Sequence, residues 1–293
     1  MQVPRWLTVL LGIPPIVSIN KITRIMKFIR ILLLGLLVSA LNTQSAEPLK
    51  ALLITGGCCH DYAKQKLIIS QGISKRANVD WDIVHEGGTG RTHKISVYLK
   101  KDWIKKYDVV VHNECFGAIG DKDFVEGMAT AHRDSGVPAV VLHCTMHSYR
   151  AADKITDEWR KLLGVTTVRH QQHVAVTIEN LEPKHPVMKG FGKSWTTPAG
   201  ELYEIVKVWP NTKVLGHAYG VRTNKNHPCV WTNQYGKARV FGTTIGHHNQ
   251  TMESETYISY LTRGLLWSCG KLDENGKPTK GYGPQKQALT LTF

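Results

Sequence analysis

Several kinds of feature are missing from this sequence of 293 residues. It has no internal repeat and no low-complexity segment, and it has no unbroken apolar run of the about 20 residues that a transmembrane helix needs. Its apolar share of 42% and charged share of 20% are close to the averages of globular proteins. Collagen-like, coiled-coil and mostly disordered chains are therefore excluded, and the length allows one large core or two modest ones.

Short motifs with a known mechanism are missing as well. There is no HExxH, no CxxC pair and no nucleic-acid-binding motif, and the lysines are scattered instead of forming a basic face interleaved with aromatics. We therefore expect no nucleic-acid partner. The six cysteines, from Cys58 to Cys269, lack the spacing of a disulfide framework, so most are predicted to be buried thiols, with one bridge left open.

About a third of the formal charge of +14 comes from the start of the chain. Residues 1–45 carry five basic residues and no acidic one, which leaves about +9 on the remainder. From Met26, the basic residues Lys27 and Arg30 flank the front of the apolar run Ile31–Leu41, and small residues follow up to Ala46. This is the anatomy of a secretory signal peptide.

We therefore predict export to the periplasm or the cell exterior, with cleavage near Ser45 and Ala46, and no stable membrane span in the mature chain. Residues 1–46 are interpreted as an extension plus this signal peptide, with Met26 as the natural start. An N-terminal membrane anchor is the alternative interpretation.

Past the leader, short apolar runs alternate with amphipathic segments, which predicts a doubly wound, mostly parallel α/β sheet in three layers, flavodoxin-like. From Thr166 the pattern is β-rich, either as strands added to that sheet or as a small layer beside it. The domain is predicted over 47–271, with a surface tail over 272–293. The predicted strands are Leu49–Thr55, Val79–His85, Asp108–Asn113 and Pro138–His143; the predicted helices are Tyr62–Ala77, Ser96–Tyr107, Asp121–Gly136 and Ser254–Cys269.

Ligands of open parallel sheets bind at the carboxyl ends of the strands. That rule selects His60 after the first strand, Glu114 after the third, His143 after the fourth and His247 after the last strong strand. Each has a plainer interpretation: His60 as a loop residue, Glu114 as a cap, His143 as a hydrogen-bonded core residue. In a strand, the doublet of His247 and the residue after it would point to opposite sides.

Other histidines are weighed in the same way. His112 lies inside a strand and is expected in the core, and His147 shares a face with His143 if a helix begins there. His170 and His173 are weak candidates.

Among the carboxylates, Glu201 is the better candidate for proton transfer or positioning, whereas Glu204 is expected on a solvated strand face. Trp231 either stacks on a sugar ring or packs in the core, with the core favoured.

Three histidines and a carboxylate would also suit a divalent metal, but their spacing gives no independent support, so the cofactor stays undetermined. Cys144 follows a strand as the nucleophile of a hydrolase does, yet its flanking residues are too bulky for the strained turn that such a nucleophile needs.

Several segments together resemble the trehalose-utilisation (ThuA-like) family. They are ALLITGG with a following His, VVLHCTMHSY, HPVMKGF, ELY, and HPCVWTNQYGKARVFGTTIGHH leading to a helix with RGLLW. The resemblance runs from about Lys50 to Lys271, and its most specific stretch lies between His227 and His247.

This resemblance implies a class I glutamine amidotransferase-like fold and a role in disaccharide or keto-sugar metabolism. It implies site roles for His143, Glu201, Tyr203 and His247. The Gly-x-Cys-x-Gly elbow of true amidotransferases is absent around Cys144, so glutamine hydrolysis is not expected.

The leading hypothesis is an exported enzyme that acts on a small carbohydrate, such as a disaccharide or a 3-keto-glycoside. In it His143 and His247 relay protons or hold a metal, Glu201 orients them and His60 covers the site, with Glu114, Tyr203 and Trp231 as substrate contacts. A non-catalytic sugar-binding module and a Cys144-dependent hydrolase are the alternatives. The oligomeric state is not predicted.

Overall fold

The computed structural model describes residues 46–284, so the predicted leader lies outside the described residues. Strand and helix alternate up to residue 163, and strands dominate from there to residue 243. The strands are β1 (Leu49–Gly57), β2 (Val79–His85), β3 (Val109–Cys115), β4 (Ala139–Leu142), β5 (Val165–His170), β6 (Thr177–Asn180), β7 (Ser194–Thr196), β8 (Tyr203–Val208), β9 (Lys213–Gly220), β10 (Lys225–Tyr235) and β11 (Ala238–Thr243). The helices are α2 (Tyr62–Ser74), α3 (Lys122–Ser135), α4 (Glu158–Leu163), α5 (Asn249–Met252) and α6 (Glu255–Ser268), with 3-10 turns η1 (Ser96–Leu99), η2 (His143–His147), η3 (Arg150–Ala152) and η4 (Pro186–Met188).

A sheet of nine strands, in the order β2-β1-β3-β4-β11-β10-β9-β6-β7, runs through the domain, and β5 and β8 form a separate antiparallel pair. The pairs from β2 to β11 are parallel, whereas those from β11 to β7 are antiparallel. The sheet is therefore mixed instead of mostly parallel. The reason is the short β9–β10 and β10–β11 connections, because parallel pairing needs a long crossover.

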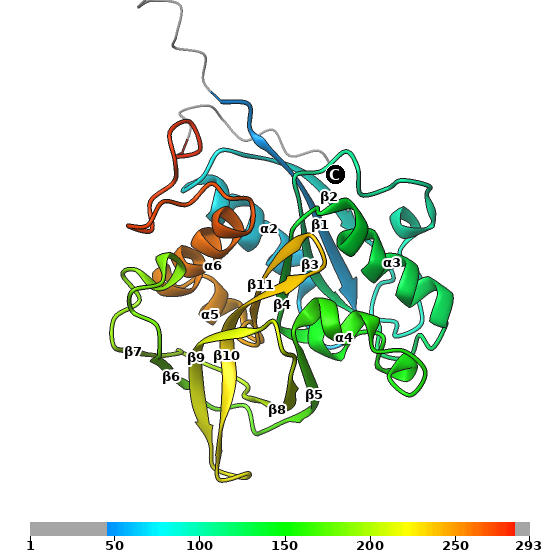
Figure 1. Ribbon diagram of the computed structural model, residues 1–293. Helices are drawn as coiled ribbons and strands as arrows, with labels where there is room; N and C mark the ends of the chain where they lie inside the picture. Colours follow the sequence, from blue (N-terminus) through cyan, green and yellow to red (C-terminus); the bar gives the residue numbers. More distant parts are fainter. Residues whose placement is uncertain (1–45, 285–293) are drawn as a thin grey trace, which may run out of the picture. The chain divides into compact units, whose positions relative to one another are not determined.

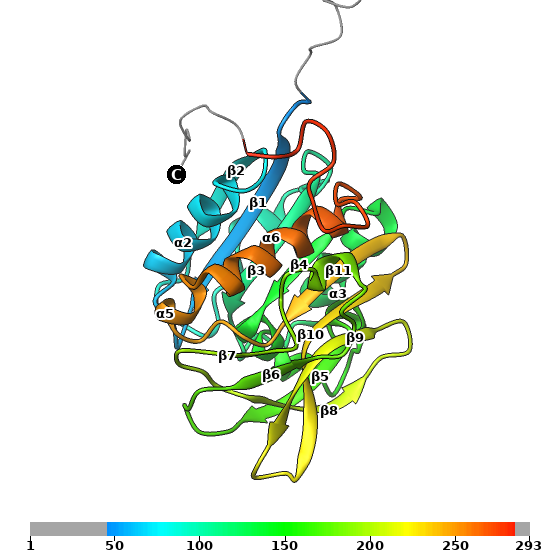
Figure 2. The same cartoon turned by 90° about the vertical axis from the view of Figure 1, so that its left-hand side faces the viewer.

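Helices cover both faces of the sheet, which confirms the predicted three-layer α/β architecture. Figure 1 shows α2 and α6 on one side and α3 and α4 on the other, and in Figure 2 α2 and α6 lie in front of the parallel strands. Alternate residues of β1 point to the two cores: Leu53 packs in the cluster that includes α6, and Leu52 in the cluster that includes α4. Burial on both faces explains the unbroken apolar run of β1.

The predicted helix boundaries hold for α3. Asp121 accepts a hydrogen bond from the Phe124 amide at 3.1 Å, and Gly136 ends the helix in the left-handed conformation at a φ of 81°. The helix predicted over Ser96–Tyr107 is wrong. Its backbone turns extended at Lys100 and left-handed at Asp102, because Tyr98 and Trp103 both turn inward to the core.

The described part of the tail packs against the domain. The backbone N–H of Asn78 donates a hydrogen bond to the backbone carbonyl of Tyr282 at 3.0 Å, and the Tyr282 side chain packs on the core. None of the helices between residues 46 and 284 is long and apolar enough to cross a membrane.

Candidate active site

A pocket of about 480 Å³ opens at the carboxyl ends of the parallel strands, where the sequence places its candidate residues. Loops that follow β1, β4 and β11 meet there with the loop before β8. The residues that line it are Cys58, Cys59, His60, Arg91, Cys115, Gly117, Cys144, His147, Arg150, Val168, Arg169, His170, His173, Glu201, Tyr203 and His247. Among these described lining residues Glu201 is the only acid, so the pocket is rich in imidazole and guanidinium groups.

The four residues predicted to be catalytic converge in this pocket. The ring centroid of His60 lies 4.8 Å from that of His143 and 4.7 Å from that of His247, and the latter two are 5.4 Å apart. Glu201 completes the group, with Oε2 at 3.1 Å from Nε2 of His143 and 3.2 Å from Nδ1 of His247. These distances are short enough for the side chains to act on one substrate atom.

The end of β4 holds His143 in an uncommon conformation. Its φ of 42° is in the left-handed region, where a non-glycine residue is strained, and such strain often marks functional sites. The Nδ1 of His143 lies 2.6 Å from the carbonyl oxygen of Thr244, and a Cβ at Gly246 would come within 3.3 Å of the Cβ of His143. The glycine therefore lets the loop after β11 approach and orient the imidazole.

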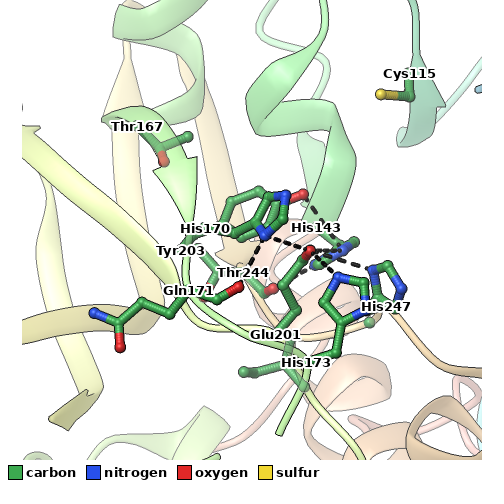
Figure 3. A network of polar contacts seen from close by, with 12 residues as sticks. Cys115, His143, Thr167, His170, Gln171, His173, Glu201, Tyr203, Thr244 and His247 are labelled. Carbon is green, nitrogen blue, oxygen red and sulfur yellow. Dashed lines mark hydrogen bonds and ion pairs between the residues drawn. The ribbon is translucent and has the colours of Figure 1, made fainter. Parts of the chain in front are cut away.

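Glu201 lies in the loop just before β8, and four imidazoles surround its carboxylate (Figure 3). While Oε2 faces His143 and His247, Oε1 lies 2.8 Å from Nδ1 of His170 and 2.8 Å from Nε2 of His173. Glu201 is only 4% exposed, and His143 and His247 are largely buried with it, whereas His170 and His173 lie at the exposed side of the carboxylate. Both oxygens of the carboxylate are thereby fixed in direction.

Burial decides the charge state of this group. Burial, then repulsion from His143 and His247, lowers the pKa of His60 to about 2. Burial likewise lowers the pKa of His143. Burial opposes ionisation of Glu201, but hydrogen bonds with His143 and His247 outweigh it and hold the pKa of this carboxyl far below its usual range. The site thus combines an ionised Glu201 carboxylate with neutral imidazoles at His60 and His143.

His170 and His173, only weak candidates from the sequence, are among the four rings around Glu201. His170 reaches the pocket because β5 pairs with β8 and places it opposite Tyr203. That pairing joins segments more than 30 residues apart, and only the His-Gln-Gln-His spacing hinted at it. His147, in η2, lines the pocket, and its ring stacks on Tyr203 with centroids 4.3 Å apart.

Of the three predicted substrate contacts, only Tyr203 lines the pocket, with its hydroxyl 3.3 Å from Nε2 of His143. Trp231 is completely buried and donates from Nε1 to the carbonyl of Leu163 at 2.8 Å. Glu114 is also completely buried, behind the pocket wall, where its Oε1 accepts from the Tyr98 hydroxyl at 3.0 Å. The structure therefore places Trp231 and Glu114 in the core and away from any bound molecule.

Two expectations about neighbouring residues are wrong. Glu204 is not on a solvated face: it is 6% exposed, because Arg222 pairs with it at 2.8 Å. The doublet His247–His248 is not in a strand, since β11 ends at Thr243. The two rings lie 4.4 Å apart and both lie near Glu201, because the chain turns there to begin α5.

Three of the cysteines that line the pocket, Cys58, Cys59 and Cys144, are either bonded or held in the protonated form. A disulfide joins Cys58 and Cys59 at the pocket rim. A hydrogen bond with Cys115, together with burial, raises the pKa of Cys144 well above its ordinary value. A thiol that stays protonated is a weak nucleophile, so the structure gives no support to a Cys144-dependent hydrolase.

Several sets of side chains in the pocket have the composition of a metal site. His60, His143 and His247 offer one ligand atom each within 4.8 Å of one another. Two further groups within the same limit are His173, His247 and His248, and His170, His173 and Glu201.

Fold and site together define a three-layer α/β protein with an imidazole-rich pocket at the carboxyl edge of its sheet. The sequence profile of the ThuA family, described as trehalose utilisation, matches residues 50–268. The chain belongs to this family, and its fold is of the glutamine amidotransferase-like kind.

Solved structures agree with this assignment. A ThuA-like protein from Parabacteroides merdae is 20% identical with a TM-score of 0.63, over 82% of this chain and 98% of its own. A ThuA-like protein from Bacteroides uniformis is 17% identical with a TM-score of 0.57, over 81% and 97%. At such identities the likeness shows the fold alone. A search of curated proteins finds no match.

Proposed function

We propose that this ThuA-family protein is an enzyme of carbohydrate metabolism whose substrate is an oxidised sugar, such as a 3-keto-glycoside or keto-disaccharide. The observation that carries the proposal is the ionised Glu201 carboxylate among four imidazoles, open to a pocket of about 480 Å³. That volume falls within the range of small-molecule sites. The family's association with trehalose utilisation supports a sugar as the substrate.

A keto group explains why such a site is needed. The proton on the carbon next to the carbonyl is removed, its bonding electrons move toward the carbonyl oxygen, and the glycosidic oxygen leaves with a proton as an alcohol. The products are an unsaturated keto-sugar and that alcohol, so the step balances without an oxidant. This chemistry needs a group that withdraws electrons from the carbonyl and a fixed route for the proton.

The site can meet these needs in two ways. His143 and His247 accept and return protons while Glu201 balances their charge, or the imidazoles hold a divalent cation that polarises the carbonyl. In both, His60 covers the inner end of the site. Arg91 and Arg150 of the pocket wall can donate hydrogen bonds to sugar hydroxyl oxygens.

The test replaces His143 and His247 one at a time by Ala and measures turnover of a keto-glycoside, after calorimetry has confirmed that the substrate still binds. We expect both variants to lose most turnover. His217→Ala is the matched control, because that imidazole contacts Glu179 at 3.1 Å outside the pocket. Unchanged turnover in both site variants would contradict the proposed roles of His143 and His247. If the parent protein binds the sugar saturably but does not turn it over, the protein is a sugar-binding module and not an enzyme.

We also propose that the protein is exported, on the strength of the signal-peptide pattern that begins at Met26. The disulfide between Cys58 and Cys59 supports an oxidising compartment. Mass spectrometry of the protein recovered outside the cytoplasm should give a first residue near Ala46. Recovery of the uncleaved chain in the cytoplasm would contradict export.

A further inference from the structure

Three imidazoles from three separate strand ends converge on one point of the pocket. His60 follows β1, His143 follows β4 and His247 follows β11, and each offers a nitrogen within 4.8 Å of the others. The rings meet edge to face, at interplanar angles of 80° to 81°.

The position of the proton on His143 leaves a lone pair of its ring facing a lone pair of the Glu201 carboxylate. A carbonyl oxygen can only accept, so the 2.6 Å contact with Thr244 places a proton on Nδ1 of His143. Its Nε2 then presents a lone pair, 3.1 Å from the carboxylate oxygen Oε2 of Glu201. In addition, Nδ1 of His60 is buried and has no hydrogen-bond partner among the described residues. The Tyr203 hydroxyl, 3.3 Å from the same Nε2 of His143, can donate to that lone pair, whereas Nδ1 of His60 has no such donor.

A cation suits this arrangement better than a further proton does. A proton would bury a charged imidazolium at His143, which is 1% exposed and has two further rings, His60 and His247, at its side. A cation held between the rings accepts a lone pair from several neutral imidazoles at once.

We propose that His60, His143 and His247 bind one divalent transition-metal ion, with Glu201 as the carboxylate that balances its charge. Imidazole nitrogens suit zinc, cobalt, nickel and iron, whereas calcium and magnesium prefer sites made of oxygen atoms. The Thr244 carbonyl fixes the tautomer of His143, and His170 and His173 hold the other oxygen of Glu201. Such outer contacts are the usual supports of ligating side chains.

This inference deepens the proposed function and rests on it only for the substrate. It assigns the polarising role to an ion, and it assigns His143 and His247 to holding that ion instead of relaying protons. The pocket leaves the ion accessible to a carbonyl or hydroxyl oxygen of a sugar, as a catalytic metal requires.

A competing place for the ion lies at the mouth of the pocket. His173, His247 and His248 also come within 4.8 Å of one another, and His173 is exposed. The two places share His247 but differ in the remaining rings. Replacement of His60 and of His248 therefore separates them.

The experiment titrates the chelator-treated protein with Co²⁺ and Zn²⁺, follows the visible absorption of Co²⁺, and measures bound metal after gel filtration. We expect one equivalent per chain, and at least a tenfold loss of affinity in both His60→Ala and His247→Ala. His248→Ala and His217→Ala should bind as the parent protein does. Circular dichroism confirms that each variant is folded, and His247→Ala serves if a more deeply buried variant fails to fold.

Two outcomes overturn the metal site: no stoichiometric binding of either ion, or a loss of binding in His248→Ala that His60→Ala does not share. Because binding is measured without substrate, the two proposals can fail separately. If the protein binds the metal ion but does not turn over a keto-glycoside, the proposed function is wrong and the metal site stands. If the protein binds no metal ion and still turns over a keto-glycoside after chelator treatment, the metal site is wrong and the proposed function stands.

Discussion

Two of the sites in the described part of the chain bring several histidines together with a buried glutamate, and these two sites differ in what surrounds them. The pocket group consists of His60, His143, His170, His173, His247 and Glu201 and opens to solvent at the edge of the sheet. The closed group consists of Tyr98, His112, Glu114, His132 and Tyr149 and lies between the sheet and α3, with every member but Tyr98 at 0% exposure.

The two groups differ in whether their imidazole nitrogens have hydrogen-bond partners. The Val137 carbonyl fixes a proton on Nδ1 of His132 at 2.7 Å, so Nε2 of His132 accepts from His112 at 3.1 Å. The other nitrogen of His112 lies 3.0 Å from the Tyr98 hydroxyl, which can donate to it, so both rings have partners at both nitrogens. In the pocket group Nδ1 of His60 has none among the described residues. Oε2 of Glu114 in the closed group also has no partner among the described residues, but it is sealed from solvent, whereas His60 lines an open pocket. The closed network therefore supports the fold, and the pocket group is the one that a ligand can reach.

The sharpest test of this contrast is Glu201→Gln. The amide keeps the size of the side chain but removes the charge among four imidazoles, so we expect keto-glycoside turnover to fall about a thousandfold, roughly 4 kcal/mol of transition-state stabilisation. Steady-state kinetics measure the loss. A variant with full turnover would show that the pocket group is as structural as the closed one.

The converse change is Glu114→Ala in the closed group. It removes the acceptor shared by the Tyr98 and Tyr149 hydroxyls, and we expect the free energy of unfolding to fall by about 3 kcal/mol. Urea unfolding measures it, with Glu179→Ala as an exposed control that also loses a histidine contact. Equal stability of the two variants would contradict a supporting role for the network.

The closed group also predicts a dependence of stability on pH. Burial, then repulsion from His112, lowers the pKa of His132 to about 3, so between pH 6.5 and 3 the unfolded chain binds a proton that the folded chain does not. Stability therefore falls as the pH drops below 6.5, by about 2 kcal/mol at pH 5 from this residue. Unfolding at pH 7 and pH 5 should show a smaller difference in His132→Gln than in the parent protein. An identical difference would exclude His132 as the cause.

The smallest expected effect belongs to the edge of the pocket group. His173 is exposed and touches Glu201 only at Oε1, which His170 also contacts, so its loss leaves the carboxylate partly oriented. We expect His173→Ala to lower turnover about tenfold, near 1.4 kcal/mol, with unchanged stability. Kinetics and a thermal melt check both values. A loss as large as that of Glu201→Gln would make His173 a participant in the chemistry instead of a positioning residue.

The sequence predicted much of the frame. Apolar spacing in the sequence predicted the strands β1 to β4 and the helices α2, α3 and α6. It could do so because a strand or helix that is buried on one or both faces carries apolar residues at regular intervals. Three of the converging residues, His60, His143 and His247, were found because parallel strands deliver their carboxyl ends to one edge. The segment over Ser96–Tyr107 was misread as a helix, because its inward residues, Tyr98 among them, mimic helical spacing.

Local sequence by itself determined the α/β class, the family and the edge of the sheet at which chemistry would lie. Only the tertiary structure decided which carboxylates and which outer histidines belong there. Glu201 enters the pocket and Glu114 does not, and His170 arrives through the pairing of β5 with β8. The physical reason is that periodic burial is a local property of the chain, whereas partners, proton positions and exposure depend on contacts between segments far apart in sequence.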